Sequence, residues 1–182
     1  MMMNSKLFYG EKVKLTAPRE EDVDILVKWG DDEEYLRNVD TDMALPKTRD
    51  QWAKEGSTGS NAVYFRLRTI DNDELIGFAA IYGIEWNNRT GVLSIGIGQS
   101  VHRSKGYGSD AIKLILRYAF HELNLDRVGL DVIEYNTGAI KAYEKAGFKL
   151  EGRKRSMVYR DGKRYDLILM GLLRDEWEAT QR

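Results

Sequence analysis

The chain is predicted to fold as an α/β (α+β) domain in which a mostly antiparallel sheet is covered by helices. Three observations support this fold class. Apolar residues recur at helical spacing between positions 112 and 123, as they do on the buried face of a long helix. Several short segments rich in β-forming residues follow one another with turn residues between them. Near the C-terminus, Asp161 and Gly162 form the dipeptide typical of a tight hairpin turn.

Composition predicts one domain spanning residues 1–182. The chain has 182 residues, of which 42% are hydrophobic and 31% charged, with a formal net charge of -1. Such a chain has enough apolar side chains to bury a core and lacks the low hydrophobicity of disordered proteins. A nearly neutral chain also lacks the basic surface that nucleic-acid binders usually carry, so we expect no nucleic-acid partner.

The rare residue types exclude several classes of site. Cysteine is absent and histidine occurs only at positions 102 and 121. We therefore expect no disulfide, no metal site and no acyl-cysteine intermediate. No apolar run approaches the roughly 20 residues that span a bilayer, and the first residues lack a signal-peptide core. A cytoplasmic location without membrane association is expected.

The first half of the chain begins with a strand and a helix. Alternation of apolar and polar residues predicts a strand over residues 12–16, and acidic residues before an apolar periodic run predict a helix over 20–30. The pattern loosens over residues 31–60, where only a short helix at 47–55 is expected. The turn at Asp71, Asn72 and Asp73 then joins the two arms of a hairpin. The strands expected in this half lie at residues 63–68, 75–84 and 92–97.

The second half contains the clearest helix. It begins near Ser109 and carries the apolar face described above. A strand is expected at 127–133, and a shorter helix follows Asn136 and ends at Gly147, which suits a helix C-terminus. A strand then begins at 148–150, and segments 157–160 and 163–170 flank the Asp161-Gly162 turn.

A glycine-containing loop lies between the strand that ends near Gly98 and the long helix. Residues 103–108 read RSKGYG. Glycines let the backbone approach a ligand, and free N–H groups at a helix N-terminus bind phosphate oxygens. The loop loosely fits a dinucleotide fingerprint, but several residues separate it from its strand, and it lacks the Gly-Lys-Ser/Thr of a nucleotide P-loop. A glycine turn with only a structural role also remains open.

Two motifs resemble the GNAT N-acetyltransferase superfamily. The R-x-x-G-x-G run at 103–108 looks like its acyl-CoA pyrophosphate loop, and residues 136–148, NTGAIKAYEKAGF, resemble its N-x-x-A-I-x-x-Y-x-x-x-G-F signature. Residues 151–166 resemble the branch of ribosomal-protein N-terminal and spermidine acetyltransferases. The resemblance, which spans roughly residues 10–175, implies a sheet of about seven strands that splay apart between the fourth and fifth. About four helices flank that sheet in the family.

The resemblance also implies a binding site for acetyl-CoA as co-substrate. In the family the pantetheine arm lies against the fourth strand and the pyrophosphate lies on the loop. The residues that this places at the cofactor are Ile95, Gly96, Ile97, Arg103, Ser104, Lys105, Gly106, Tyr107, Gly108, Ser109 and Asn136. Asn136 also suits a helix N-cap.

Catalysis requires a neutral amine, and an amine with a pKa near 10 must lose a proton before it attacks a thioester. Tyr143 matches the family position where a tyrosine hydroxyl approaches the CoA sulfur, and we expect it to act as general acid. Asp131 and Glu85 are the candidates for general base. The acidic residues 32–34 could attract a cationic amine, although such a run is often a solvated face.

The resulting hypothesis is an N-acetyltransferase that uses direct attack in a ternary complex. Its acceptor would be a primary amine of a polyamine, an amino acid or a peptide or protein N-terminus. The alternative is an acyl-CoA-binding or sensing module without turnover, and a dinucleotide-dependent oxidoreductase is a more distant alternative. Analogy with the family also makes a homodimer plausible.

Overall fold

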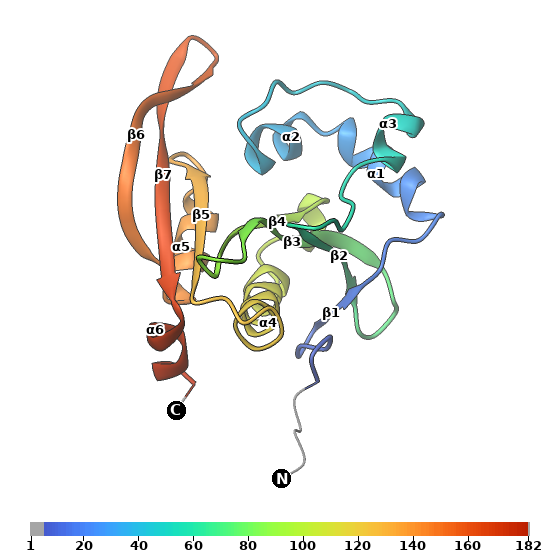
Figure 1. Cartoon of the computed structure of the whole chain (residues 1–182). Coiled ribbons are helices and arrows are strands. Elements are labelled where there is room, and N and C mark those ends of the chain that lie inside the picture. The colour runs from blue at the N-terminus through green and yellow to red at the C-terminus, as the bar shows by residue number, and fades with distance from the viewer. Residues whose placement is uncertain (1–5, 182) are drawn as a thin grey trace.

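The computed structural model describes residues 6–181 and is built around one seven-stranded mixed sheet (Figure 1). The strand order is β1-β2-β3-β4-β5-β7-β6. Neighbouring strands are antiparallel except β4 and β5, which are parallel. The strands are β1 (Val13–Thr16), β2 (Val63–Thr69), β3 (Leu75–Glu85), β4 (Thr90–Ile97), β5 (Arg127–Ile133), β6 (Lys149–Arg160) and β7 (Lys163–Leu173). The fold class and the strands expected from the sequence are confirmed.

Six α-helices lie in the described part of the chain, two more than the four expected. The helices are α1 (Asp22–Gly30), α2 (Glu33–Val39), α3 (Arg49–Ala53), α4 (Tyr107–His121), α5 (Thr137–Lys145) and α6 (Arg174–Ala179). The additional helices are α2 and α6, which are only seven and six residues long. Such short helices lack the repeated apolar spacing from which a helix is recognised in sequence. In α2 the helix starts because the Asp32 side chain accepts hydrogen bonds from the N–H groups of Glu34 and Tyr35.

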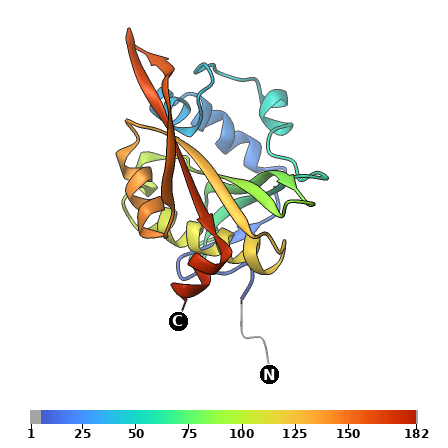
Figure 2. The ribbon, with the colours of Figure 1, turned by 60° about the vertical axis from the view of Figure 1, so that its left-hand side comes forward.

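The helices cover the two faces of the sheet unequally. Figure 1 shows α1, α2 and α3 over one face of β2–β4 and α4 against the opposite face, and Figure 2 shows the same layers after rotation. The apolar face of α4 packs on the sheet and forms one side of the main core, with Ile115 and Phe120 fully buried. A second core joins α1, α2 and α3 around Trp29, Tyr35 and Trp52. The second core holds α2 beside the end of β4.

The sheet divides between β4 and β5. Only Thr90, Gly91 and Val92 of β4 pair with β5, whereas β4 continues beside β3 as far as Ile97. The last five residues of β4 therefore have no partner strand on one side. This confirms the splay between the fourth and fifth strands, and it leaves backbone polar groups facing a gap in the sheet.

The start of α4 is tied to the start of β1 by one carboxylate. Asp110 lies in the first turn of α4 and is nearly buried, and it accepts hydrogen bonds from the backbone N–H groups of Glu11, Lys12 and Val13 at 3.1, 2.7 and 2.9 Å. An extra carbon on Gly10 would lie 2.5 Å from this carboxylate. The N-terminus of α4, and the loop before it, are thereby fixed to the edge of the sheet.

Candidate active site

A cavity lies beside the end of β4, in the gap where β4 separates from β5, and we refer to it as the first cavity. It has a volume of about 400 Å³, and β4, α2, α5 and the loop before α4 line it. Gly98 N–H donates to the carbonyl of Ile76 on β3 at 2.9 Å. Because backbone groups alternate sides along an antiparallel strand, the N–H and C=O groups of Ile97 and Ile95 point away from β3, toward the gap. A ligand with amide groups can form strand-like hydrogen bonds there.

The loop before α4 forms one end of this cavity. Ser104 and Gly106 have positive φ angles of 59° and 83°, and Gly106 is the N-cap of α4. Glycine adopts this conformation without the steric cost that a side chain brings. The helix that follows has 15 residues, so its free N–H groups and its dipole favour an anion at this end. Lys12 adds a nearby positive charge, since its ammonium donates to the Lys105 carbonyl at 2.8 Å.

Arg103 bridges the loop and α2. Its guanidinium lies 2.9 Å from the Glu34 carboxylate and 3.9 Å from that of Asp32, and it also donates to the Gly98 carbonyl. Of these acceptors, Glu34 lines the first cavity, as Arg103 itself does. Arg103 is only partly exposed, so it contributes a positioned cation at this rim.

Most residues predicted to bind the cofactor come together in the first cavity. Nine line it: Ile95, Gly96, Ile97, Arg103, Ser104, Gly106, Gly108, Ser109 and Asn136. Lys105 and Tyr107 do not. Lys105 contributes its backbone carbonyl to Lys12, and the Tyr107 ring packs on the core and against His102.

A second cavity of about 520 Å³ adjoins the first on the side of β2 and β3. Asn38, Val39, Ile95, Asn136, Ala139 and Tyr143 line both cavities. Two carboxylates, Asp40 and Asp131, face the second cavity, and none of its lining residues is lysine, arginine or histidine. Burial raises the pKa of Asp40 above its ordinary value. The part of this cavity beside Asp40 and Asp131 therefore suits a cation.

Tyr143 lies at the junction of the two cavities. It projects from α5, is 8% exposed and packs edge-on against Phe148. Burial raises the pKa of its hydroxyl to about 12, because the phenolate would lose hydration there. The hydroxyl therefore stays protonated at neutral pH and can donate a proton or a hydrogen bond.

The two base candidates lie in different places. Asp131 is on β5 and lines the second cavity, where its charge helps to raise the pKa of Tyr82 after the larger effect of burial. Glu85 lies at the end of β3, outside both cavities, and its carboxylate accepts a hydrogen bond from the Asn88 side chain at 2.6 Å. Asp131 and Tyr143 thus line the same cavity, whereas Glu85 lies outside it.

Several lining residues were not singled out from the sequence. Tyr35, Asn38 and Val39 come from α2, which was not expected, and His102 comes from the short 3₁₀ helix Ser100–His102. His102 is buried, and its Nε2 lies 3.2 Å from the Glu74 carboxylate. The acidic N-cap before the α2 segment was the signal that could have revealed that helix.

The β6–β7 hairpin holds α2 from the far side. Arg37 of α2 forms an ion pair with Asp161 at the hairpin turn at 2.8 Å, and Arg160 donates to the Asp42 carbonyl at 2.9 Å. The Tyr135 hydroxyl donates to the Arg37 carbonyl. These contacts fix α2 as a wall shared by both cavities.

Comparison with known proteins identifies the class of protein. The model of the acetyltransferase (GNAT) domain matches residues 12–149, so the chain belongs to the GNAT acetyltransferase family. Its sequence relatives are named N-acetyltransferases, and the protein is an acetyltransferase. Within residues 6–181, no group of three or more histidine or acidic side chains could hold a metal ion, and no helix is long and apolar enough to cross a membrane.

Particular relatives cover almost the whole chain. The SPbeta prophage-derived uncharacterized N-acetyltransferase YokL of Bacillus subtilis is 29% identical over 94% of this chain and 95% of its own length. The putative ribosomal N-acetyltransferase YdaF of Bacillus subtilis is 28% identical over 86% of this chain and 82% of its own. The crystal structure of spermidine N-acetyltransferase from Vibrio cholerae, in complex with CoA and spermine, superposes with a TM-score of 0.79 at 21% identity. It covers 91% of this chain and 98% of that one.

Proposed function

We propose that this protein transfers the acetyl group of acetyl-CoA to a primary amine by direct attack, with the acyl-CoA in the first cavity and the amine in the second. One observation carries the proposal: the two cavities meet at Ile95, Asn136, Ala139 and Tyr143, beside the gap between β4 and β5. An acyl group and an amine held in separate cavities would meet only there.

The first cavity fits the chemistry of a CoA thioester. Backbone groups of Ile95 and Ile97 can pair with the amides of a pantetheine arm, and the N-terminus of α4 with Gly106 and Arg103 can bind pyrophosphate oxygens. The co-substrate supplies a thioester whose carbonyl carbon is the electrophile. The solved structure of similar fold, spermidine N-acetyltransferase from Vibrio cholerae, is a complex with CoA, which supports a CoA thioester as the co-substrate.

The transfer exchanges a C–S bond for a C–N bond and an N–H bond for an S–H bond. The neutral amine attacks the thioester carbon, the new C–N bond forms, and the C–S bond breaks to leave CoA thiol and the acetylated amine. A β4 backbone N–H is suited to stabilise the negative charge that develops on the carbonyl oxygen. The Tyr143 hydroxyl is suited to protonate the departing sulfur, since it remains protonated at neutral pH. The proton that the nitrogen loses on acetylation replaces the one that the Tyr143 hydroxyl gives to the sulfur.

An ammonium group in the second cavity needs a proton acceptor, and β5 offers one candidate. Asp131 is accessible there and could accept this proton directly or through water. Asp40 adds a second negative charge for attracting a cationic amine. The similarity to spermidine acetyltransferases of Vibrio cholerae supports an amine acceptor. The homodimer and the cytoplasmic location remain predictions.

The decisive experiment measures binding and turnover on the same sample. Isothermal titration should detect acetyl-CoA but neither NAD nor ATP. Arg103→Ala should lower the affinity for acetyl-CoA by about 10- to 100-fold, since it removes a charge-assisted contact. Arg49→Ala is the matched control, because Arg49 pairs with Asp24 on the surface and lines neither cavity.

Turnover is then assayed as release of free CoA with a panel of amines. Release that depends on the amine would support transfer, and the product amide should be detected by mass spectrometry. Binding of acetyl-CoA with no release across polyamines, amino acids and peptides would favour a sensing module instead. Absence of acetyl-CoA binding would overturn the proposal.

A further inference from the structure

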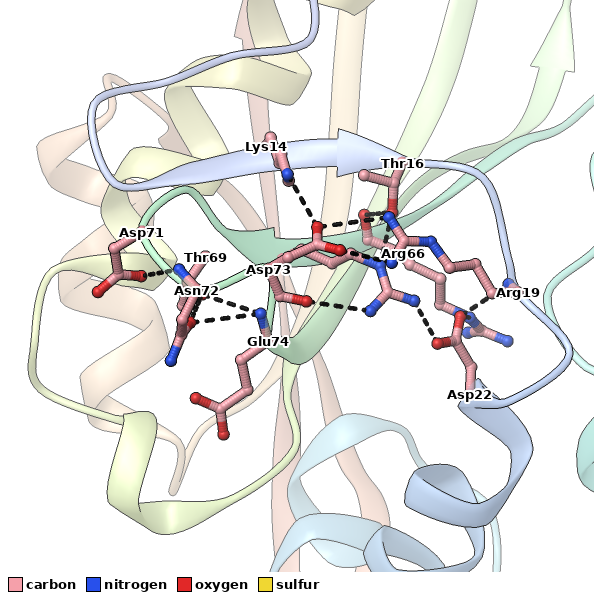
Figure 3. A network of polar contacts seen from close by, with 11 residues as sticks. Lys14, Thr16, Arg19, Asp22, Arg66, Thr69, Asp71, Asn72, Asp73 and Glu74 are labelled. Carbon is pink, nitrogen blue, oxygen red and sulfur yellow. Dashed lines mark hydrogen bonds and ion pairs between the residues drawn. The ribbon is translucent and has the colours of Figure 1, made fainter.

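Strand β2 carries two buried arginines, one of which contacts a residue that lines the second cavity. Arg66 and Arg68 are each 4% exposed, and Asp22, at the start of α1, is 1% exposed. Figure 3 shows Arg66 and Asp22 within a larger set of polar contacts between β1, the β2–β3 turn and α1. Two buried cations thus share the neighbourhood of one buried carboxylate.

The Asp22 carboxylate interacts mainly with groups other than Arg66. One of its oxygens forms an ion pair with Arg68, and the other accepts the backbone N–H of Arg19 at 2.8 Å. The nearest approach of Arg66 to this carboxylate is 3.9 Å, through Nε, which has no hydrogen-bond partner in the part of the chain that the structure describes. Arg66 is therefore a buried cation without a carboxylate of its own, which is a costly arrangement for a purely structural residue.

Arg66 instead holds a tyrosine that faces the second cavity. Its Nη1 donates to the Tyr64 hydroxyl oxygen at 2.9 Å, and its guanidinium lies 5.0 Å from the centre of the Tyr64 ring. The ring is also stacked on Phe78, with centroids 5.4 Å apart and an interplanar angle of 7°. Tyr64 lines the second cavity, whereas Arg66 does not. Arg66 and Phe78 thus fix the orientation of the Tyr64 side chain.

This contact determines what the Tyr64 hydroxyl can offer a ligand. Arginine has donors and no acceptor, so the hydrogen of the Tyr64 hydroxyl cannot point to Arg66 and is free to be donated elsewhere. Burial raises the pKa of this hydroxyl to about 12, so the hydrogen is retained at neutral pH. Tyr64 thus brings to the wall of the second cavity a hydroxyl that has a hydrogen left to donate and a positive charge beside it, a combination that suits an oxygen acceptor and opposes an ammonium group at this position.

The register of the sheet sets the distance of this donor from the reaction centre. Tyr64 of β2 pairs with Ala80 of β3, which pairs with Ser94 of β4, and all three line the second cavity. Ser94 precedes Ile95, where the two cavities meet. Strands two apart lie roughly 9–10 Å from each other, so the Tyr64 backbone is separated from β4 by about that distance, and we expect a group bound by Tyr64 to be several bonds away from the attacking nitrogen.

We propose that the Tyr64 hydroxyl, held by Arg66, binds a carbonyl or carboxylate oxygen of the acceptor, several bonds from its amine. The inference rests on the proposed function and narrows its acceptor class. It favours a peptide N-terminus or an ω-amino acid over a polyamine, whose distal groups are ammonium donors.

The test compares 6-aminohexanoate with hexylamine, which are matched in length and in amine, and adds trialanine and spermidine as further acceptors. 6-Aminohexanoate and hexylamine differ by the carboxylate alone at the far end, trialanine supplies carbonyl oxygens, and spermidine supplies distal ammonium groups. In the wild type, kcat/KM for 6-aminohexanoate should exceed that for hexylamine by about 10-fold or more, the value of one good hydrogen bond. For trialanine, whose amine is less basic, the loss of kcat/KM in Tyr64→Phe is the measure of the hydrogen bond. Whether Tyr64→Phe impairs 6-aminohexanoate or trialanine more strongly shows whether Tyr64 binds a carboxylate or a peptide carbonyl.

Tyr64→Phe removes the donor and keeps the ring. It should lower kcat/KM for the preferred oxygen-bearing acceptor by about 10- to 100-fold and change that for hexylamine by less than about 3-fold. The matched control is Tyr159→Phe, because Arg164 lies over the exposed Tyr159 ring at 5.2 Å, outside both cavities. Acetyl-CoA affinity and melting temperature are measured for each variant to establish that it is folded.

The outcomes separate this inference from the function on which it rests. Equal or higher kcat/KM for hexylamine or spermidine in the wild type would overturn the inference and leave acetyl transfer intact, and that result needs no variant. An equal loss on all amines in a folded Tyr64→Phe protein would also overturn it. Failure to acetylate any amine would overturn the proposed function, and this inference with it.

Discussion

Asp110 offers a quantitative test of how the fold positions the acyl-CoA loop. Its carboxylate accepts three backbone N–H groups, those of Glu11, Lys12 and Val13, and thereby joins the first turn of α4 to β1. Asp110→Ala removes all three hydrogen bonds at once. The donor of Val13 is fully buried and would remain without a partner, whereas the exposed Glu11 N–H can be rehydrated.

These environments set the expected magnitude. Loss of the hydrogen bond from the Val13 N–H should cost about 2–3 kcal/mol, and loss of those from Glu11 and Lys12 about 0.5–1 kcal/mol each. The free energy of unfolding should therefore fall by roughly 3–5 kcal/mol. For a chain of this size, each kcal/mol lowers the melting temperature by about 2–4 °C. A loss of roughly 6–20 °C is therefore expected, measured by circular dichroism or differential scanning calorimetry.

A surface acid provides the control for this measurement. Asp126 pairs with Arg89 at 3.2 Å, and both side chains are about half exposed. Asp126→Ala should cost at most about 1 kcal/mol, because exposed ion pairs contribute little. A melting temperature for Asp110→Ala within 2 °C of the wild type would refute the reasoning, since it would mean that the buried carboxylate does not hold β1 to α4.

Three further predictions concern catalysis and stability. Tyr143→Phe should lower kcat by about 100-fold with acetyl-CoA affinity within about 3-fold, because it removes a general acid and keeps the ring; an unchanged kcat would exclude that role. Asp22→Ala should lower the free energy of unfolding by about 3–5 kcal/mol in urea, because Arg68 loses its buried partner; a loss below 1 kcal/mol would contradict this. Arg127 hydrogen bonds and charge hold the pKa of Glu151 below its ordinary value, so the pair stabilises the fold above about pH 4 and this stabilisation is lost as pH falls through the folded-state pKa. Glu151→Gln should therefore destabilise by at most about 1 kcal/mol at pH 7, and the difference from wild type should shrink in melts as the pH falls below about 4; a difference that stays constant would count against the pair.

The long apolar helix and the strands were predictable because their signals are local. Ile115 and Phe120 mark one face of α4 by spacing alone, and the Asp161-Gly162 dipeptide marks the β6–β7 turn. The positive φ angle of Gly106 agrees with the loop expected there. Short helices such as α2 depend on packing and caps, so their sequences carry much weaker signals.

By itself, the sequence determined the family, the order of the main elements and the position of the loop before α4, because motifs and hydrophobic periods are properties of neighbouring residues. Only the tertiary structure decided which side chains share a cavity. It placed Asp131 with Tyr143 and left Glu85 outside, and it brought Arg66 behind Tyr64. Such pairings depend on sheet register and helix packing between segments far apart in the chain, and neither composition nor local spacing specifies them.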